Sequence, residues 1–200
     1  MPAYFVGEID VTDTDLYETY KPMAREAVLA HGGAYLAAGG ETTVIEGAPP
    51  ANRVVVLRFP SFEAVMGWFR SDDYAEALDL RRRSTNSRTY AVEGLDVPPL
   101  ADGEAAAYYI GERDVHDEEA YKTYMPMAGP TIAQYGGAYL VRGGRVEALE
   151  GDPPMPRIIM TRWPDVATCR TWFGSPEYTP AYAIRKAAAT CRTFVVDGLA

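Results

Sequence analysis

The chain contains one domain-length sequence twice. Residues 4–95 and 108–199 align at a constant offset of 104 without a gap, and 37 of the 92 aligned residues are identical. A period near 100 residues is the size of a small domain and is far longer than a solenoid unit. We therefore predict two copies of one domain, over residues 1–95 and 108–200, joined by a linker over residues 96–107.

The composition excludes several classes of partner. The net charge of −9 argues against nucleic acid, because affinity for phosphates requires clustered lysine and arginine. No apolar run approaches the roughly 18 residues that span a bilayer. The first residues also lack the basic and apolar regions of a signal peptide. We expect a cytoplasmic protein that binds neither nucleic acid nor membrane.

The two cysteines belong to no shared framework. Cys169 and Cys191 both lie in the second copy, and the aligned residues of the first copy are Val65 and Ser87. A disulfide or metal site common to both domains would need cysteines in both. We predict two buried, reduced thiols.

Each copy opens with a strand and a helix. In the first copy, the β-rich residues 4–11 precede a helix whose start is marked by the capping-box spacing of Thr12 and Asp15. The helix contains Pro22, and its counterpart contains Pro126. Because proline removes a backbone donor and clashes with the preceding turn, we predict a break or kink in both helices.

The rest of each copy completes a β-α-β-β-α-β order. In the first copy we predict a helix end at Gly32-Gly33 and a strand from residue 34 that is interrupted at Gly39-Gly40 by a bulge or turn. A strand over residues 53–59, a helix capped by Ser61, a helix from Ser71 to about Arg88, and a strand over residues 88–93 follow. In the second copy we expect Asp117 to start the first helix and Ser175-Pro176 to cap the last one.

This order is that of the ferredoxin-like fold. Several strands are apolar on both faces, which favours sheets that are covered on both sides. We therefore predict the α+β class, with two ferredoxin-like βαββαβ units packed sheet-to-sheet.

An ordered set of motifs in both copies resembles a known family. The motifs are Gly-Gly-Ala-Tyr-Leu, Gly-Gly, Glu-Gly, Pro-Pro, a basic residue opening the third strand, Phe-Pro or Trp-Pro, Trp-Phe, and, in the second copy alone, Ser-Pro-Glu-Tyr. They resemble the bacterial DUF1330 family of the dimeric α/β-barrel superfamily. The resemblance implies that single-copy members pair as dimers, so this chain is an internal pseudo-dimer, either monomeric or homodimeric. It implies no activity, but the superfamily includes cofactor-free oxygenases, polyketide cyclases, lactone isomerases and haem enzymes.

Aromatic residues shared by both copies indicate a small-molecule cavity. Tyr74 and Arg81 are seven residues apart, which places them on one helix face. With Trp68 and Tyr20 they would form an aromatic wall with one cation, which suits a planar, oxygenated or anionic ligand. The alternative is an ordinary aromatic core from which the arginine extends to solvent.

A charged pair is also predicted within each sheet. Alternation along the strands places Glu8 and Arg58 on faces shared with apolar residues, so we expect them to pair across the first and third strands. This pair is either a buried salt bridge or part of a pocket. His31 and His116 lack a second ligand at the spacing of a helical metal site, and we predict no metal and no other cofactor.

These residues lead to a functional hypothesis. We predict a cofactor-independent enzyme of bacterial secondary metabolism that cyclises, isomerises or dehydrates an enolisable or aromatic polyketide-like substrate. The predicted catalytic residues are Arg81 or Arg185 for the enolate, Tyr20 or Tyr124 as hydrogen-bond donor, and His116, Glu8 or Glu112 for proton transfer. The predicted substrate-binding residues are Trp68, Trp172, Tyr74, Tyr178, Tyr35, Tyr139, Arg58 and Arg162.

Other functions remain open on the sequence. The first is a cofactor-free monooxygenase, and the second is a non-catalytic small-molecule-binding module. Haem binding is disfavoured, since neither histidine is shared. The copies differ where Ile9 becomes Arg113 and Lys21 becomes Met125, so one half could be specialised, but the sequence does not indicate which.

Overall fold

The computed structural model describes residues 1–97 and 107–199, so most of the predicted linker lies outside the described residues. The first repeat contains β1 (Ala3–Val11), α1 (Thr14–Ala30), β2 (Ala34–Ala38), β3 (Thr42–Glu46), β4 (Arg53–Phe59), α2 (Phe62–Phe69), α3 (Asp72–Ser84) and β5 (Thr85–Glu93). The second contains β6 (Ala107–Val115), α4 (Glu118–Gln134), β7 (Ala138–Arg142), β8 (Val146–Glu150), β9 (Arg157–Trp163), α5 (Val166–Phe173), α6 (Thr179–Ala188) and β10 (Ala189–Asp197).

The strands form two antiparallel sheets, each with one strand from the other repeat. Their orders are β2-β4-β1-β5-β8 and β3-β10-β6-β9-β7. The first compact unit therefore combines Met1–Gly40 and Pro50–Asp96 with Gly144–Pro154. The second combines Glu41–Pro49 with the described parts of Val97–Gly143 and Met155–Ala200. The predicted four strands of each ferredoxin-like unit are present, and the exchanged strand is a fifth.

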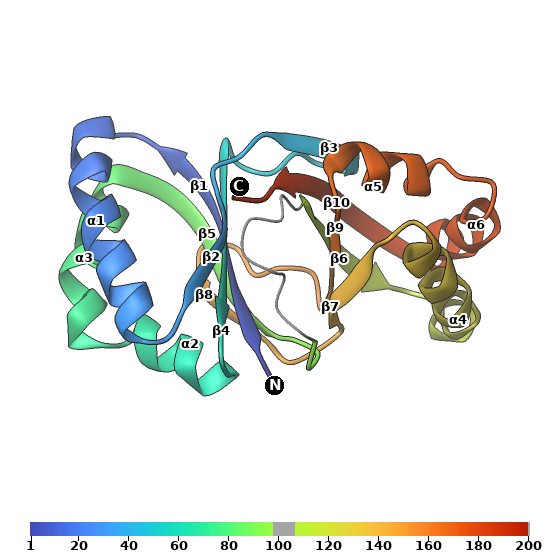
Figure 1. Cartoon of the computed structure of the whole chain (residues 1–200), viewed down its shortest axis with the longest axis horizontal. Coiled ribbons are helices and arrows are strands. Elements are labelled where there is room, and N and C mark those ends of the chain that lie inside the picture. The colour runs from blue at the N-terminus through green and yellow to red at the C-terminus, as the bar shows by residue number, and fades with distance from the viewer. Residues whose placement is uncertain (98–106, 200) are drawn as a thin grey trace. The chain divides into compact units, whose positions relative to one another are not determined.

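Helices cover one face of each sheet (Figure 1). In the first unit, α1, α2 and α3 pack on the face that presents Phe5, Leu57 and Phe59. In the second, α4, α5 and α6 pack on the face that presents Tyr109, Ile159 and Trp163. Among the described residues, no helix combines the length and the apolar character needed to cross a bilayer.

The first helices are continuous through their prolines, so the predicted break is wrong, and the predicted kink stays a prediction. Helix α1 runs through Pro22, and α4 runs through Pro126 and Pro130. Pro22 leaves the carbonyl of Glu18 without its usual helical donor, but both residues are exposed and water can take that place. The start of α4 at Asp117 is confirmed by its side chain, which accepts a hydrogen bond from Ala120 N.

The last helices differ from the prediction at one end each. Helix α3 ends at Ser84, and Arg88 lies within β5, because Thr85 begins the strand three residues earlier than predicted. Helix α6 begins at Thr179. Ser175 caps the preceding turn by accepting a hydrogen bond from Tyr178 N, so it does not cap the helix itself.

We expect both thiols to be unreactive in the folded chain. Cys169 and Cys191 are buried, and burial raises the pKa of Cys169 to about 12 and that of Cys191 above its ordinary value. Because the thiolate is the reactive form, Ellman's reagent at about pH 8 should label neither cysteine until denaturant is added. Rapid labelling of one thiol in the native protein would contradict this prediction.

Candidate functional site

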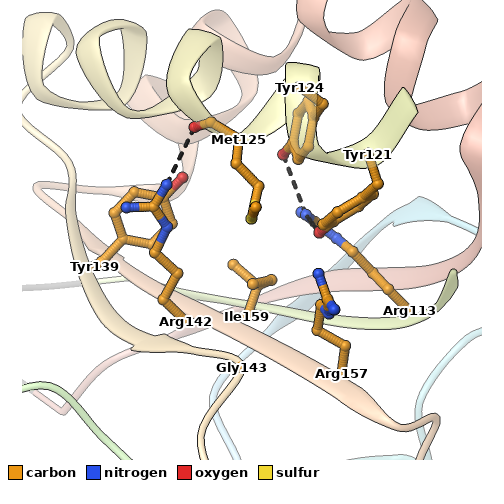
Figure 2. Close-up of a pocket in the computed structure, with 9 residues that line it drawn as sticks. All are labelled: Arg113, Tyr121, Tyr124, Met125, Tyr139, Arg142, Gly143, Arg157 and Ile159. Carbon is orange, nitrogen blue, oxygen red and sulfur yellow. Dashed lines mark hydrogen bonds between the residues drawn. The ribbon is translucent and has the colours of Figure 1, made fainter. Parts of the chain in front are cut away.

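The second compact unit contains a cavity of about 250 Å³ between α4 and its sheet (Figure 2). Its lining residues are Arg113 from β6, Tyr121, Tyr124 and Met125 from α4, Tyr139 and Arg142 from β7, Gly143, and Arg157 and Ile159 from β9. An engineered protein cavity of about 150 Å³ binds benzene. The volume here therefore suits one substituted ring or two fused rings.

Arg113 is a buried cation without an acidic partner. Only 2% of the residue is exposed, and it forms no ion pair with any residue that the structure describes. Its guanidinium donates to the hydroxyls of Tyr121 at 2.6 Å, Tyr124 at 3.1 Å and Tyr109 at 3.4 Å. Burial of a charge is costly unless an opposite charge compensates it. The site therefore favours a bound anion.

Arg113 also fixes how two phenols can donate. A guanidinium only donates hydrogen bonds, so the oxygens of Tyr121 and Tyr124 accept from it and keep their own protons for another acceptor. Both hydroxyls belong to residues that line the cavity. They can thus donate to a ligand oxygen while the guanidinium polarises them.

A chain of polar contacts orients Tyr124. Its hydroxyl lies 3.4 Å from that of Tyr178, which accepts from Arg185 Nε at 3.3 Å. Arg185 in turn donates to Glu46 of the exchanged strand β3 at 2.7 Å. Burial raises the pKa of Tyr178 well above its ordinary value, so it stays a phenol and can donate to Tyr124. This leaves the Tyr124 proton for the cavity.

Two further arginines line the cavity in more exposed positions. Arg142 is exposed, lies over the ring of Tyr139 at 5.1 Å, and donates to the carbonyl of Met125 at 3.2 Å. Arg157 has a side chain that is 29% exposed; it contacts Glu118 at 3.3 Å and lies over Tyr121 at 4.8 Å. Gly143, with φ of 72°, ends β7 directly after Arg142.

The aligned region of the first unit has different chemistry. Ile9, Lys21 and Ala38 stand where the second copy has Arg113, Met125 and Arg142. Arg53, which aligns with Arg157, donates to the carbonyl of Ala38 at 2.7 Å. Its guanidinium packs so closely on Gly39 that an added Cβ there would lie 2.5 Å from Arg53 Nη1. The second copy therefore has arginines at two positions that are apolar in the first, Ile9 and Ala38, whereas at the third position the cation, Lys21, is in the first copy.

The predicted aromatic and arginine residues of the first copy do come together. The hydroxyls of Tyr20 and Tyr74 lie 3.4 Å apart, and the rings of Trp68 and Tyr74 are 4.4 Å apart. Arg81 is 1% exposed and forms an ion pair with Glu150 of the exchanged strand β8, so it does not extend to solvent. Tyr35 lies under Arg25, and burial raises its pKa to about 12.

The second copy repeats this cluster beside the cavity. Trp172 and Tyr178 pack with ring centroids 4.2 Å apart, and Arg185 is fully buried against Glu46. Of the predicted residues, Tyr124 and Tyr139 line the cavity, whereas Arg185, Trp172 and Tyr178 do not. Burial raises the pKa of Tyr139 above its ordinary value, which keeps its hydroxyl protonated.

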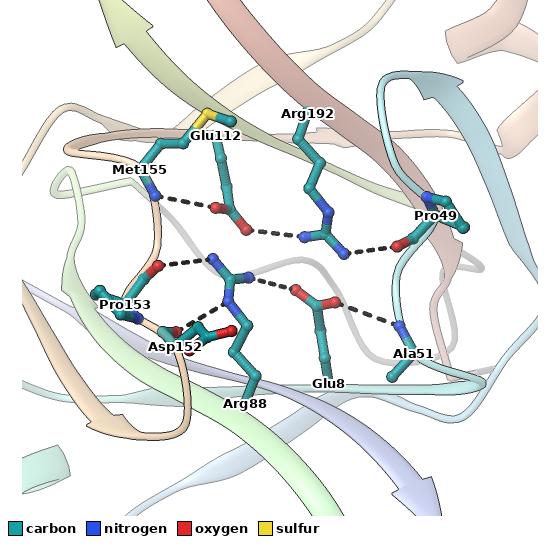
Figure 3. A network of polar contacts seen from close by, with 9 residues as sticks. All are labelled: Glu8, Pro49, Ala51, Arg88, Glu112, Asp152, Pro153, Met155 and Arg192. Atoms are coloured by element: carbon teal, nitrogen blue, oxygen red, sulfur yellow. Dashed lines mark hydrogen bonds and ion pairs between the residues drawn. The ribbon is translucent and has the colours of Figure 1, made fainter.

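The predicted pairing of Glu8 with Arg58 is wrong. Glu8 pairs with Arg88 at 2.7 Å, because these residues are directly opposite on β1 and β5 (Figure 3). Arg58 shares the sheet face but stands opposite Tyr4, farther along the strand. Glu8 also accepts a hydrogen bond from Ala51 N at 3.3 Å, so this buried carboxylate holds the loop between β3 and β4 in place.

The second unit has the same arrangement. Glu112 pairs with Arg192 at 2.9 Å and accepts from Met155 N at 3.0 Å (Figure 3). Arg162, the counterpart of Arg58, lies opposite Tyr108 and Ala138. Neither Glu112 nor Arg162 lines the cavity.

The histidines also lie away from the cavity lining. His116 is exposed in the turn before α4, where its backbone N–H donates to Ala188 O. His31 caps the end of α1 and places Nδ1 2.9 Å from Ala27 O. Within residues 1–97 and 107–199, no group of three or more histidine, cysteine, aspartate or glutamate side chains could hold a metal ion.

Solved structures with the same fold cover nearly the whole chain. A candidate monooxygenase from Fusobacterium nucleatum subsp. nucleatum ATCC 25586 is 12% identical, with a TM-score of 0.61, over 100% of this chain and 93% of its own. An anthrone oxidase-like protein is 13% identical, with a TM-score of 0.58, over 100% and 92%. A candidate monooxygenase from Lactobacillus acidophilus NCFM is 11% identical, with a TM-score of 0.57, over 98% and 93%. These similarities confirm the fused dimeric α/β-barrel fold.

The two sequence repeats correspond to two matches with one family model. No curated protein matches the chain. The model of a domain of unknown function, DUF1330, matches residues 2–95 and again residues 106–199. The chain therefore belongs to the DUF1330 family, as a tandem duplication of its domain.

Proposed function

We propose that this chain is a cofactor-independent enzyme that binds an enolisable aromatic or polyketide-like small molecule in the cavity of the second unit. The observation that carries the proposal is Arg113, a buried cation without an acidic partner among the described residues, aimed at two phenols that line the cavity. In this proposal the substrate is held as its enolate or phenolate, and its oxygen accepts from Tyr121 and Tyr124.

Such a site accelerates reactions that pass through an oxyanion. Fixed donors that face developing charge in a water-poor site contribute roughly 100- to 1,000-fold to a rate for each donor. Arg113 supplies the compensating positive charge without moving, because it is already held by three tyrosine hydroxyls. The chemistry proposed here is stabilisation of the enolate by this preformed site.

Two reactions of an enolate remain candidates. Cyclisation, isomerisation or dehydration needs a group that moves a proton between positions, and Tyr121 or Tyr124 can supply one. Oxygenation starts from the same enolate: the α-hydrogen leaves as a proton to water, O₂ bonds to the enolate carbon, protonation gives a hydroperoxide, and loss of water leaves a ketone. None of the nine described lining residues is a carboxylate or a histidine, so the lining does not distinguish the two reactions.

Turnover assays should separate these reactions. With 2-tetralone as a two-ring enolisable probe, oxygenation consumes one O₂ per ketone formed and stops under nitrogen. Proton-transfer chemistry is followed instead by exchange of the α-hydrogens in D₂O, and it continues under nitrogen. If the chain binds the probe but neither reaction exceeds the rate in buffer, it is a binding module and the enzymatic proposal fails.

The oxyanion site itself is tested with 4-nitrophenol, whose phenolate is coloured. We expect the bound probe to ionise at a lower pH than the free probe, since Arg113 and the two phenols stabilise the anion. Arg113→Ile, which introduces the residue of the first copy, should abolish this shift in a visible-absorbance titration. Arg53→Ala is the matched control, because Arg53 aligns with Arg157 in the unit without this arrangement. An unchanged titration of Arg113→Ile, with a native circular dichroism spectrum, would sink the proposal.

A further inference from the structure

We infer that the ligand of this cavity carries a second anionic group, a carboxylate, which Arg142 and Arg157 bind. The inference rests on the proposed function, because it assigns the oxyanion to Arg113 and asks what the other two arginines recognise. The ligand class is then a one- or two-ring aromatic or enolisable acid.

The charges around the cavity do not balance with one oxyanion. Three arginines line it, and Glu118, at 3.3 Å from Arg157, is their only acidic partner among the described residues. One enolate or phenolate would offset Arg113 and leave one positive charge over. A second anionic group restores the balance. The excess is notable in a chain whose net charge is −9, because the positive site then attracts anions that the rest of the surface repels.

The guanidinium groups of Arg142 and Arg157 have N–H donors that are free to bind a ligand. Each arginine has five N–H donors. The structure uses one of those of Arg142 for the carbonyl of Met125 and directs Arg157 Nη2 to Glu118. Stacking over the rings of Tyr139 and Tyr121 holds both groups in place. Fixed planar guanidinium groups are well suited to a carboxylate, which accepts paired hydrogen bonds.

The three arginines differ in their exposure to solvent, and this difference indicates which one binds the oxyanion and which ones bind the carboxylate. Arg113 is buried, whereas Arg157 is part-exposed and Arg142 is exposed. A carboxylate is strongly hydrated and costs least to bind where water still reaches it. An enolate or phenolate oxygen on a ring can enter the buried end. The ligand is therefore oriented with its carboxylate outward.

The first copy shows which substitutions create this feature. Arg142 replaces Ala38, and Glu118 replaces Thr14. In the first unit, Arg53 donates to the carbonyl of Ala38 itself and packs on Gly39. In the second unit, the corresponding Arg157 forms an ion pair with Glu118 instead. A Cβ added to Gly143 would lie 3.6 Å from Arg157 Cγ, an ordinary van der Waals distance, so Arg157 does not pack as closely on this glycine.

Two matched probes test the inference. They are 4-nitrophenol and 5-hydroxy-2-nitrobenzoate, which is 4-nitrophenol with one added carboxylate. For the intact chain we expect the carboxylate to increase affinity at least about tenfold, as charge-assisted bidentate contacts do. In Arg142→Ala this gain should fall to about threefold or less, while the affinity for 4-nitrophenol changes by less than about twofold. Arg157→Met should act in the same direction. Arg170→Ala removes an exposed arginine outside the lining and should leave both affinities unchanged.

The outcomes distinguish this inference from the proposed function. The inference fails if the carboxylate brings no gain, or if the gain survives both Arg142→Ala and Arg157→Met. The oxyanion site fails instead if 4-nitrophenol does not bind or if its ionisation does not depend on Arg113. Arg142→Lys keeps the charge but loses the planar fork, so partial recovery of the gain would support recognition of a carboxylate by geometry as well as charge.

Discussion

Replacing Glu150 with alanine should lower the free energy of unfolding by about 3–5 kcal/mol, the cost of removing one partner from a buried ion pair. Glu150 ends the exchanged strand β8 and pairs with both Arg81 and Arg82. The Arg81 side chain is only 1% exposed, so without Glu150 its charge is left without compensation. The corresponding change in the second unit, Glu46→Ala, removes the partner of fully buried Arg185 and should have a similar effect.

Urea denaturation monitored by circular dichroism measures this effect. Glu147→Ala is the control on the same strand, because its partners Arg70 and Arg145 have side chains 68% and 58% exposed. Exposed pairs contribute at most about 1 kcal/mol. Equal destabilisation by the two substitutions would show that the Arg81 pair is not the anchor of β8.

The exchanged strands explain why the compact units differ from the sequence repeats. Each unit holds its fifth strand with an ion pair to the helix that precedes its own last strand. Arg88 adds hydrogen bonds to the carbonyls of Asp152 and Pro153, and Arg192 adds one to Pro49. Both repeats therefore contribute to each unit, and neither unit is complete within one repeat.

The order of the ferredoxin-like elements was predictable because it follows from local signals. Hydrophobic periodicity, caps such as Asp117, and glycines such as Gly32 with φ of 72° mark the elements within a few residues. The exchange of β3 and β8 was not predictable, since alternation along a strand does not identify the strand beside it. The same limit explains the Glu8 error: the pattern gave its sheet face, whereas register decides that it meets Arg88 and not Arg58.

The candidate site was predicted in part. Residues shared by both copies identified Tyr124 and Tyr139 in the lining, together with the adjacent Tyr178 and Arg185. Arg113, Arg142 and Arg157 were missed as the cationic part of the site, although the exchange of Ile9 for Arg113 was visible. A charged residue at a strand position that is apolar in the other copy is the signal that could have identified Arg113 and Arg142. Residues shared by the copies supply the tyrosines of the lining, and differences between the copies supply Arg113 and Arg142.

The proposed chemistry predicts a large effect even for Arg113→Lys. Lysine keeps the positive charge but cannot donate to Tyr121, Tyr124 and Tyr109 in the fixed planar arrangement that the guanidinium provides. We expect kcat for an enolisable substrate to fall roughly 100- to 1,000-fold, the effect of losing one oxyanion-stabilising group. KM should change much less, because the lost interaction strengthens as charge develops in the transition state.

Tyrosine variants distinguish a direct role in the reaction from a packing role. Tyr121→Phe and Tyr124→Phe each remove one hydroxyl that accepts from Arg113 and retain the ring, so each should lower kcat. Each also takes an acceptor from a buried guanidinium, which should lower the free energy of unfolding by about 1–3 kcal/mol. Tyr20→Phe is the matched control, since Tyr20 aligns with Tyr124 but lies in the unit where Ile9 replaces the arginine. If Tyr20→Phe lowers kcat as much as Tyr124→Phe, the reaction is not confined to the second unit. If only the second-unit variants do so, the arginine that distinguishes the copies determines where the oxyanion forms.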